Sequence, residues 1–593
     1  MSLLPDDESL APAAQVIAGA LDDYLSRLHD IIRRARQHFE RADWHAAQED
    51  SARRLDLYNE AVREGLNRLH GLLGPRIADR DTWTLLREAY ASLIGGRGDR
   101  DVAETFFNSF TRRLFDTVGV EARVEFVTPR GGGAPQATGA SVTLRFERRG
   151  SLEDLFREML ETYRFETPWD DLAGDVERIT PRAEAACEAG CEVTGLELAR
   201  PVFFRGKGAY LVGRLLTTLG PLPFVLALTN PEGRIVVDAV LATLDEVSIV
   251  FSFARSYFFV EMESPREMVA FLHSILPRKP LAELYNAIGW NRHGKTELYR
   301  SILHHLATSD DRFETAPGQR GMVMAVFALP GFDVVFKVIR DRFEPPKTVT
   351  PDEVRQKYRL VFRHDRAGRL VDAQEFEHLE FERARFDEPL LAELTSQCAE
   401  RVHVRGDKVV ISHLYTERRL VPLDVYLRET GENSEAAREA VIDYGQVLRD
   451  LAATNIFPGD MLTKNFGVSR NGRLIFYDYD ELCRLDECRF RALPQPRDDA
   501  DETSGEPWFY VSERDIFPEE FRNFLGLPPA LLRVFLEHHE ELLGPAFWLR
   551  MQELHARGRV LDVYPYRSLR RLRWRPRTAD RRPDPFLSKE PGP

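Results

Sequence analysis

Cysteine is scarce in this sequence, with five residues among 593. So few cysteines exclude a scaffold built on disulfides. Two pairs lie close in the sequence, Cys187 with Cys191 and Cys483 with Cys488, but neither has the Cys-x-x-Cys spacing that is typical of a zinc site. We therefore expect all five cysteines to be ordinary thiols.

Long apolar runs are missing as well. No stretch approaches the roughly 18 consecutive apolar residues that a membrane-spanning helix needs. The first residues, MSLLPDDESLAPAAQ, have neither the basic region nor the apolar region of a secretion signal. These absences predict a cytoplasmic protein that does not enter a membrane.

A positive overall charge is also absent, since the formal net charge is −14. A net acidic chain is poorly suited to bind nucleic acid over its whole surface, and we expect no nucleic-acid partner. The charge is uneven, because residues 498–506 are acidic and residues 567–582 are strongly basic. These stretches are typical of a solvated loop and a solvated tail, and the alternative for the tail is docking on an acidic partner.

The chain does contain enough apolar material for more than one core. Hydrophobic residues make up 43% and charged residues 30% of the sequence, whose length predicts two to four domains. From residue 11 to about 120 the pattern predicts long amphipathic helices, because Leu21, Tyr24 and Leu28 recur at spacings of three and four. Gly74-Pro75 should end the second helix, and a flexible glycine-rich loop is expected at 131–139.

The middle of the chain changes to strand-like segments that are rich in Val, Leu and Phe. Turn residues separate them, and TNPEGR at 229–234 is typical of a hairpin connection. An antiparallel sheet is therefore expected inside a mostly helical region, which returns to helix over 265–308. The expected strands are 141–146, 209–217, 223–229, 234–241 and 247–260.

From about residue 311 the order becomes strand, turn, strand, helix, and after 390 it becomes mostly helical with one short strand pair near 467–478. A small sheet lobe before a larger helical lobe is the arrangement of protein kinases. We expect an α+β protein: an N-terminal, mostly helical regulatory domain (1–310) with an inserted antiparallel sheet, then a bilobal protein-kinase-like domain (311–593). The expected parts of the second domain are a small lobe at 311–415, a large lobe at 416–565 and a basic tail at 566–593.

The first chemical motif spans residues 316–341 (APGQRGMVMAVFALPGFDVVFKVIRD). Gly318 and Gly321 precede one strand, and Lys337 lies on the next. Backbone N–H groups in a glycine-containing turn can approach phosphate oxygens, and a lysine on the following strand can reach them. The spacing matches neither common phosphate-loop pattern, so a plain hairpin with an exposed lysine is the alternative.

A second segment, DAQEFEHLEFERARF at 372–386, is predicted to be a helix. In kinases a helix at this point supplies a glutamate that pairs with the strand lysine. Glu375, Glu377 and Glu380 are the candidates, and a solvated glutamate face is the alternative.

Two further segments have the spacing of kinase catalytic machinery. In FPGDMLTKNFGV, Asp460 and Asn465 match the Asp-x-x-x-x-Asn loop, where the aspartate accepts a hydroxyl proton and the asparagine holds a metal ion. Lys464 can neutralise charge on the transferred phosphoryl group. In GRLIFYDYDELCR, a strand leads into Asp478, at the place of the kinase metal-binding aspartate, and Asp480 replaces the usual glycine.

The ordered set of a lysine, Asp-x-x-x-x-Asn and a strand-end aspartate is far more specific than any one motif. With APGQRGMVM, FKVIRDRFEPPK, HDRAGRLVDAQEFE, GDMLTKNFGV and FYDYDE, the chain resembles the isocitrate dehydrogenase kinase/phosphatase family over essentially its whole length. The resemblance implies a bifunctional enzyme that phosphorylates a serine of NADP-dependent isocitrate dehydrogenase and removes the same phosphate, directing isocitrate between the citric acid cycle and the glyoxylate bypass. It also implies ATP as substrate and AMP or ADP as regulators.

Residue by residue, the resemblance places ATP binding at one segment and one lysine. Asp372 falls at an active-site position, although it would serve equally well as the N-cap of the predicted helix. Asp460 and Lys464 fall in the catalytic loop, and Asn465, Asp478 and Asp480 fall at metal positions, for Mg²⁺ or Mn²⁺. The ATP-binding positions are Ala316, Pro317, Gly318, Gln319, Arg320, Gly321, Met322 and Lys337.

Phosphatase chemistry has no separate signature in the sequence, which favours one site for both reactions. An atypical serine/threonine kinase without phosphatase activity stays an alternative, as does a catalytically dead kinase-like scaffold. A homodimer is also open, because two copies could engage a dimeric dehydrogenase.

Overall fold

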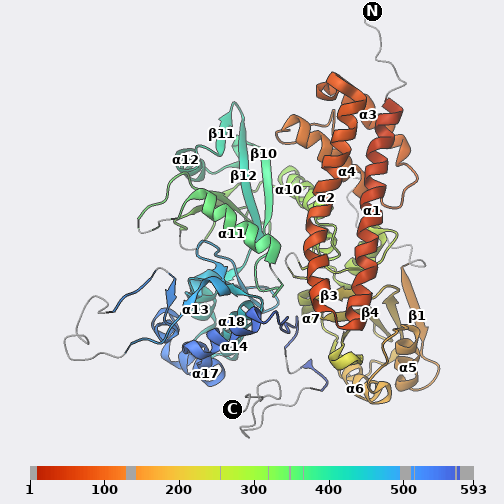
Figure 1. Ribbon diagram of the computed structural model, residues 1–593, viewed down its shortest axis with the longest axis vertical. Helices are drawn as coiled ribbons and strands as arrows, with labels where there is room; N and C mark the ends of the chain where they lie inside the picture. Colours follow the sequence, from red (N-terminus) through yellow and green to blue (C-terminus); the bar gives the residue numbers. More distant parts are fainter. Residues whose placement is uncertain are drawn as a thin grey trace, which may run out of the picture.

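The computed structural model describes residues 10–573 apart from 128–141, 254–255, 318–319, 346, 348, 365, 495–508, 513 and 568–569. Two bodies lie side by side, one formed by the first 310 residues and one by the residues that follow (Figure 1). The expected glycine-rich loop and the acidic run lie outside the described residues, as does most of the basic tail. None of the helices in the described part is long and apolar enough to cross a membrane.

Four helices form the long side of the N-terminal body, as the periodicity predicts. The expected face of the first helix is buried at Leu21, Tyr24 and Leu28. Asp43 caps the second helix by accepting a hydrogen bond from the Ala46 N–H, and this helix ends at Gly74, whose φ of +55° favours glycine. The helices are α1 (Leu10–Arg41), α2 (Trp44–Leu73), α3 (Arg80–Leu93) and α4 (Arg100–Phe115).

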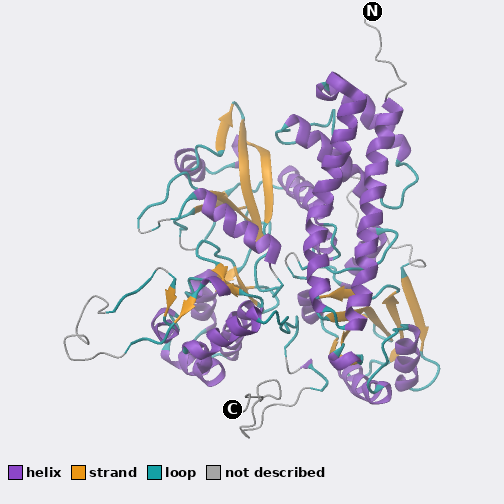
Figure 2. Ribbon diagram, viewed as in Figure 1, coloured by secondary structure: helices purple, strands orange, loops and turns teal. Residues whose placement is uncertain are grey.

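A six-stranded antiparallel sheet lies at one end of these helices (Figures 1 and 2), and it confirms four of the five expected strands. The strand order is β1-β2-β4-β5-β6, with β3 paired to β4, and the predicted hairpin connects β5 to β6. Helices α5 (Leu152–Thr162) and α6 (Leu172–Ala185) lie beside the sheet. The strands are β1 (Thr143–Glu147), β2 (Val193–Ala199), β3 (Phe203–Arg205), β4 (Gly208–Thr217), β5 (Leu222–Thr229) and β6 (Val236–Leu241).

The fifth expected strand, 247–260, is wrong at its start, because α7 occupies Leu244–Val250. Thr243 and Glu246 form a capping box there, in which each side chain bonds the other residue's backbone N–H. This Thr-x-x-Glu signal starts a helix and overrides the β-branched residues inside it.

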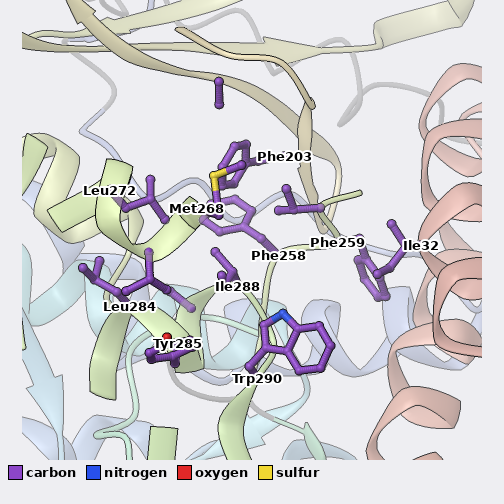
Figure 3. Packing of buried hydrophobic residues seen from close by; sticks show 14 of the residues in the cluster. Ile32, Phe203, Phe258, Phe259, Met268, Leu272, Leu284, Tyr285, Ile288 and Trp290 are labelled. Carbon is purple, nitrogen blue, oxygen red and sulfur yellow. The ribbon is translucent and has the colours of Figure 1, made fainter. Parts of the chain in front are cut away.

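The predicted helical return over 265–308 is confirmed by α8 (Pro265–Ile275), α9 (Leu281–Ala287) and α10 (Asn291–Thr308). Side chains from α8 and α9 meet Phe203 of β3 and Phe258 in a shared core, with Ile32 of α1 at its edge (Figure 3). This apolar cluster fixes α9 against the sheet, whereas Tyr299, Ile302 and Leu306 of α10 belong to the core of the second sheet, in the C-terminal body.

The C-terminal body begins with a second six-stranded sheet of order β10-β12-β9-β8-β7, in which β11 pairs with β12. Helix α11 (Pro351–His364) lies across it, and α12 (Glu388–Gln397) lies near β11 (Figure 1). The strands are β7 (Glu314–Thr315), β8 (Met324–Ala328), β9 (Val334–Ile339), β10 (Gln374–Glu382), β11 (Val402–Arg405) and β12 (Lys408–Arg418).

The helix predicted over 372–386 is wrong, because most of this segment is strand β10. His378 has a φ of +53° and lacks a partner in the pairing of β10 with β12, so it forms a bulge. The bulge lets Phe376, Leu379 and Phe381 all face the core. An apolar spacing of three across a bulge imitates the spacing of a helix. The mostly helical pattern expected after 390 also missed β11 and β12.

The large lobe is mostly helical, and the strand pair expected near 467–478 is confirmed by β15 (Phe466–Val468) and β16 (Leu474–Phe476). The helices are α13 (Leu423–Thr430), α14 (Glu435–Ala453), α16 (Phe521–Phe524), α17 (Pro529–His539) and α18 (Pro545–Ala556). The remaining short strands are β13 (Val421–Pro422), β14 (Ile456–Phe457), β17 (Cys483–Arg484), β18 (Arg489–Phe490) and β19 (Asp515–Ile516). All five cysteines are free, as expected.

The described part of the basic tail returns to the N-terminal body instead of extending into solvent. Arg571 binds the buried Asp238 of β6 through two nitrogens, and Tyr566 donates to the same carboxylate at 2.7 Å. Arg573 pairs with Asp175, and Arg567 pairs with Glu439 on α14 of the large lobe. The expectation of a solvated tail is wrong for these residues, which together clamp the two bodies.

Candidate active site

Lys337 is buried on β9 and not exposed as the plain-hairpin alternative would have it. Its Nζ lies 2.7 Å from a carboxylate oxygen of Glu417 and donates to the Tyr477 carbonyl at 3.1 Å. The ammonium also lies 5.3 Å from the centre of the Tyr477 ring. These contacts join the small-lobe sheet to the segment that carries Asp478.

The lysine's acidic partner is not one of the three predicted glutamates. Glu375 bonds to His413 at 2.8 Å, and the Cβ of Glu380 lies close to Gly119 of the N-terminal body. Glu417 of β12 takes the role instead. Tyr415 lies opposite Lys337 in the antiparallel pairing, so the side chain two residues on, Glu417, emerges on the same face. Correct pairing of the strands would have identified it, but sequence reasoning had missed β12.

The predicted phosphate-binding segment, residues 316–322, begins beside β8 and leads into that strand. The Ala316 N–H donates to the Val326 carbonyl, and the Gly321 carbonyl accepts from Arg340 at 3.3 Å. Arg320 lies 3.4 Å from Glu393, with its own side chain largely exposed, and Met322 is also exposed. Gly318 and Gln319 lie outside the described residues, and Pro317 lies just before them.

The catalytic-loop residues follow β14. Gly459 has a φ of +77°, and a Cβ there would lie 2.4 Å from the Glu481 carbonyl oxygen, so only glycine fits this turn. Asp460 accepts a hydrogen bond from the Leu462 N–H at 2.9 Å. The buried Asn465 donates to the Asp460 carbonyl at 3.5 Å, and this contact holds the two residues of the motif together.

The strand pair β15–β16 brings the loop to the aspartates. The Tyr477 N–H donates to the Asn465 carbonyl at 3.1 Å, and the Tyr477 hydroxyl donates to the Lys464 carbonyl. Asp478 follows directly. Lys337, Asn465 and Asp478 therefore meet around Tyr477.

Asp478 and Asp480 form a close carboxyl pair. Burial, together with the charge of Asp480 and a hydrogen bond to it, raises the pKa of Asp478 to about 8, against the opposing effect of Lys337 and Lys347. Lys347 lies 3.3 Å from Asp480. Two like charges in a buried place are costly unless a proton or a cation lies between them. The pair can therefore hold either a proton or a cation.

The oxygen donors fit the predicted metal. Asn465, Asp478 and Asp480 offer hard amide and carboxylate oxygens, which suit Mg²⁺ or Mn²⁺. Among the described residues there is no group of three or more His, Cys, Asp or Glu side chains arranged to hold a metal ion by themselves. This is expected where substrate phosphates complete the coordination, as Mg²⁺ sites in kinases generally require.

Asp372 lies apart from these residues, at the junction of the two bodies. Its carboxylate accepts from Asn286 of α9 at 3.2 Å and from Gln374 at 3.0 Å. It cannot be a helix N-cap, because a strand follows it. The neighbouring Val371 N–H donates to the Phe476 carbonyl at 3.1 Å, so Asp372 lies near the strand that leads to Asp478.

A cavity of about 530 Å³ lies between the two bodies, at the C-terminal end of α11. Burial lowers the pKa of Arg54 to about 10, and burial also lowers the pKa of Arg366. No hydrogen bond or ion pair in the described part of the chain neutralises Arg366. A cavity with such cations and aromatic rings suits a planar anionic ligand. Its lining includes Trp44, Arg54, Phe259, Phe362, Arg363, Arg366, Arg484 and Arg559.

Two family models match successive parts of the chain. The family described as "Isocitrate dehydrogenase kinase/phosphatase (AceK), regulatory domain" matches residues 14–310, and "Isocitrate dehydrogenase kinase/phosphatase (AceK) kinase domain" matches residues 311–568. The solved structure "ROP18 kinase domain in complex with AMP-PNP and sucrose" is similar with a TM-score of 0.21 and 14% identity, over 43% of this chain and 88% of that one.

Two curated relatives cover nearly the whole chain. An isocitrate dehydrogenase kinase/phosphatase of Anaeromyxobacter sp. (strain Fw109-5) is 48% identical over 571 residues, which is 96% of this chain and 99% of that protein. A protein of the same name from Anaeromyxobacter dehalogenans (strain 2CP-C) is 47% identical over 581 residues, 95% of this chain and 97% of that protein. This chain belongs to the isocitrate dehydrogenase kinase/phosphatase family.

Proposed function

We propose that this chain is an ATP-dependent protein serine kinase and a phosphoprotein phosphatase, and that its substrate is NADP-dependent isocitrate dehydrogenase. In this role it controls the flow of isocitrate between the citric acid cycle and the glyoxylate bypass, in the cytoplasm where these enzymes work. The observation that carries the proposal is the convergence of Lys337, Asn465 and Asp478 around Tyr477. A scaffold would have no use for a buried lysine beside a strained carboxyl pair.

In the kinase direction, Lys337 and the backbone of 316–322 would hold the ATP phosphates. Asp460 would orient the serine hydroxyl and accept its proton. Lys464 would offset the negative charge on the phosphoryl group during its transfer. Such reactions depend mainly on positioning and electrostatics. Asn465, Asp478 and Asp480 would hold Mg²⁺ or Mn²⁺. The metal, when bound, neutralises charge on the β- and γ-phosphate oxygens.

For dephosphorylation we propose the same site. Asp480 is the carboxylate that ordinary kinases lack at this position, and it would serve to orient water or adjust the cation. Asp372 is another acidic group close to the strand that leads to Asp478, because the neighbouring Val371 N–H donates to the Phe476 carbonyl. Its anchoring by Asn286 of the N-terminal body supports a role that depends on how the two bodies are arranged.

AMP control belongs to the same proposal, with the cavity between the bodies as the candidate site. Its cationic and aromatic lining has the chemistry that a nucleoside monophosphate or ADP requires. The proposed division places a regulatory domain at 1–310, a small lobe at 311–415, a large lobe at 416–565 and a tail at 566–593. A dimeric dehydrogenase would offer two equivalent docking surfaces, so two copies of the chain could act on it together as a homodimer.

The test uses purified protein, Mg²⁺, labelled ATP and bacterial NADP-dependent isocitrate dehydrogenase, followed by a chase with excess AMP. We expect label to enter the dehydrogenase and then to leave it. Label that enters and never leaves would reduce the protein to a kinase. Bound ATP without any transfer would favour a scaffold.

A further inference from the structure

We propose that Glu417 and Tyr358 are positioning residues for phosphoryl transfer: Glu417 holds the phosphate-binding lysine, and Tyr358 holds Glu417. The inference rests on the proposed kinase function and deepens it, because it assigns the place of the usual helix glutamate to a strand residue and adds a second residue behind it. Neither residue is expected to touch the substrate.

The pair of Glu417 and Lys337 is almost completely shielded from water. The exposed fraction of the side chain is 2% for Glu417 and 10% for Lys337, and the two charged groups are 2.7 Å apart. A buried charge is stable only with a partner, so each side chain fixes the other. A surface pair at the same distance would be mobile and weak.

Tyr358 of α11 satisfies the other oxygen of the same carboxylate. Its hydroxyl donates to Oε1 of Glu417 at 3.0 Å, whereas Lys337 binds Oε2. Burial, strengthened by the nearby Glu417 charge, raises the pKa of Tyr358 well above its usual value, so the phenol keeps its proton and stays a donor. Both carboxylate oxygens therefore have a partner, and the carboxylate has no freedom to rotate.

The Tyr358 ring is itself held from two sides. It stacks on Tyr415 with ring centroids 3.8 Å apart, and it meets Tyr479 edge-on at 5.1 Å. The Tyr479 hydroxyl donates to the Val371 carbonyl at 2.9 Å. Tyr479 lies between Asp478 and Asp480 in the sequence. Tyr358 of α11 is therefore connected to the lysine through Glu417 and to the carboxyl pair through Tyr479.

This arrangement keeps the lysine available. Within the described residues, the Lys337 ammonium binds Glu417 and the Tyr477 carbonyl, which leaves one of its three N–H groups for a phosphate oxygen. Without Glu417 the nearby acidic partner would be Asp478, whose charge Lys337 already favours. An ion pair between Lys337 and Asp478 would move the lysine away from the phosphates. It would also occupy a carboxylate that is proposed to bind the metal.

The variants Glu417→Gln and Tyr358→Phe remove one charge and one hydroxyl with little change of shape. We expect Glu417→Gln to lower the kcat of kinase transfer roughly 10- to 100-fold, as loss of an outer partner does at metal sites, with a smaller change in the KM for ATP. Tyr358→Phe should lower kcat less. In the double variant the tyrosine change should add little, because a neutral amide no longer fixes the lysine.

Matched controls are Glu125→Gln and Tyr90→Phe in the N-terminal body. Glu125 is a buried glutamate that pairs with Arg112 at 3.0 Å, and the buried Tyr90 hydroxyl donates to the Ala103 carbonyl at 3.2 Å. These variants remove the same chemical groups from residues of the N-terminal body that have no proposed role in the site. We expect both to keep wild-type kcat per folded molecule, with folding checked by thermal unfolding.

ATP hydrolysis without protein substrate is measured beside transfer to isocitrate dehydrogenase. Wild-type protein that hydrolyses ATP but transfers nothing would refute only the proposed substrate, and the variants would still be compared by hydrolysis. Unchanged kcat in Glu417→Gln would overturn the role of Glu417. Fully additive losses in the double variant would overturn the action of Tyr358 through Glu417.

Discussion

The two bodies each contain a six-stranded antiparallel sheet, yet they differ in whether an aspartate in or beside the sheet is paired with an opposite charge or with a like charge. In the N-terminal sheet, Asp238 of β6 is buried and fully matched by Arg571 and Tyr566. Beside the small-lobe sheet, Asp478 faces the like charge of Asp480, and its pKa is raised to about 8. The first arrangement stabilises the fold, and the second is the carboxyl pair that we propose as a cation site.

The comparison indicates that architecture alone does not make a site. Both sheets have strands that are buried along most of their length. What distinguishes the second is a pair of like charges whose repulsion, together with burial, raises the pKa of Asp478, and perturbed groups of this kind cluster at functional sites. Substitutions of matched and strained aspartates should therefore have opposite consequences.

The largest effect is expected for Asp478→Asn. Kinase and phosphatase rates should both fall by about a thousandfold or more, since a preorganised electrostatic group is lost from each reaction. The folded state should become more stable at neutral pH, because a buried carboxyl with a raised pKa is replaced by a neutral group. Assays of both activities together with thermal unfolding check this. Intact phosphatase activity would disprove a shared site.

Asp480→Asn should separate the two reactions. We expect dephosphorylation of the dehydrogenase to fall more than its phosphorylation, because ordinary kinases work without a carboxylate at this position. The measurement is the ratio of the two rates in variant and wild-type protein. Equal losses would contradict a special role for Asp480.

Asp238→Asn should show the reverse of Asp478→Asn. The free energy of unfolding should fall by about 3 kcal/mol, because Arg571 loses its ionic partner in a buried setting. In buffer without denaturant, the kinase kcat per folded molecule should stay near that of the wild type. Urea unfolding measures the change, and a loss of kcat with unchanged stability would show that the clamp acts on the site instead.

The smallest effect is a pH dependence in the N-terminal body. Burial, helped by Arg300, lowers the pKa of His293 to about 3, so the folded state keeps it neutral while the unfolded chain protonates near pH 6.5. The unfolded state therefore binds more protons between these values, and stability falls as pH drops through 6.5. At pH 5 the loss is about 2 kcal/mol.

His293→Asn should reduce this decline between pH 7.5 and pH 5, even if the variant is less stable overall. Some slope should persist, because burial also lowers the pKa of His539 in the large lobe, to about 4. Denaturant unfolding at the two pH values provides the comparison. An unchanged slope would mean that His293 is protonated in the folded state.

Much of the site could be predicted because its residues follow one another in a fixed order along strands and turns. The Asp460–Asn465 spacing and the strand before Asp478 are local features; β16 confirms the strand, and the catalytic and metal roles of these residues stay predictions. Glu417 was missed since its role depends on which strand pairs with β9, a long-range fact that no local pattern contains. The helix predicted over 372–386 was wrong for a different reason, because the bulged residue His378 changes the apparent period of β10.

The tail was misread because composition does not identify a partner. Arginines in a basic stretch are usually solvated. Only the folded N-terminal body shows that Asp175 of α6 pairs with Arg573 and that Asp238 of β6 pairs with Arg571. The four-helix region was predicted well, since its apolar faces extend over many turns and average out local exceptions.

The clamp between Arg571 and Asp238 also sets an order of events during synthesis. The two residues are 333 positions apart, which at about 5–20 residues per second separates their appearance at the ribosome by roughly 15 to 70 seconds. During that time Asp238 has been made and Arg571 has not, so an N-terminal sheet that folds early would enclose this aspartate without its ionic partner. The catalytic loop also emerges before the clamp, so a nascent chain would carry the loop and the aspartates before its two bodies are fastened together.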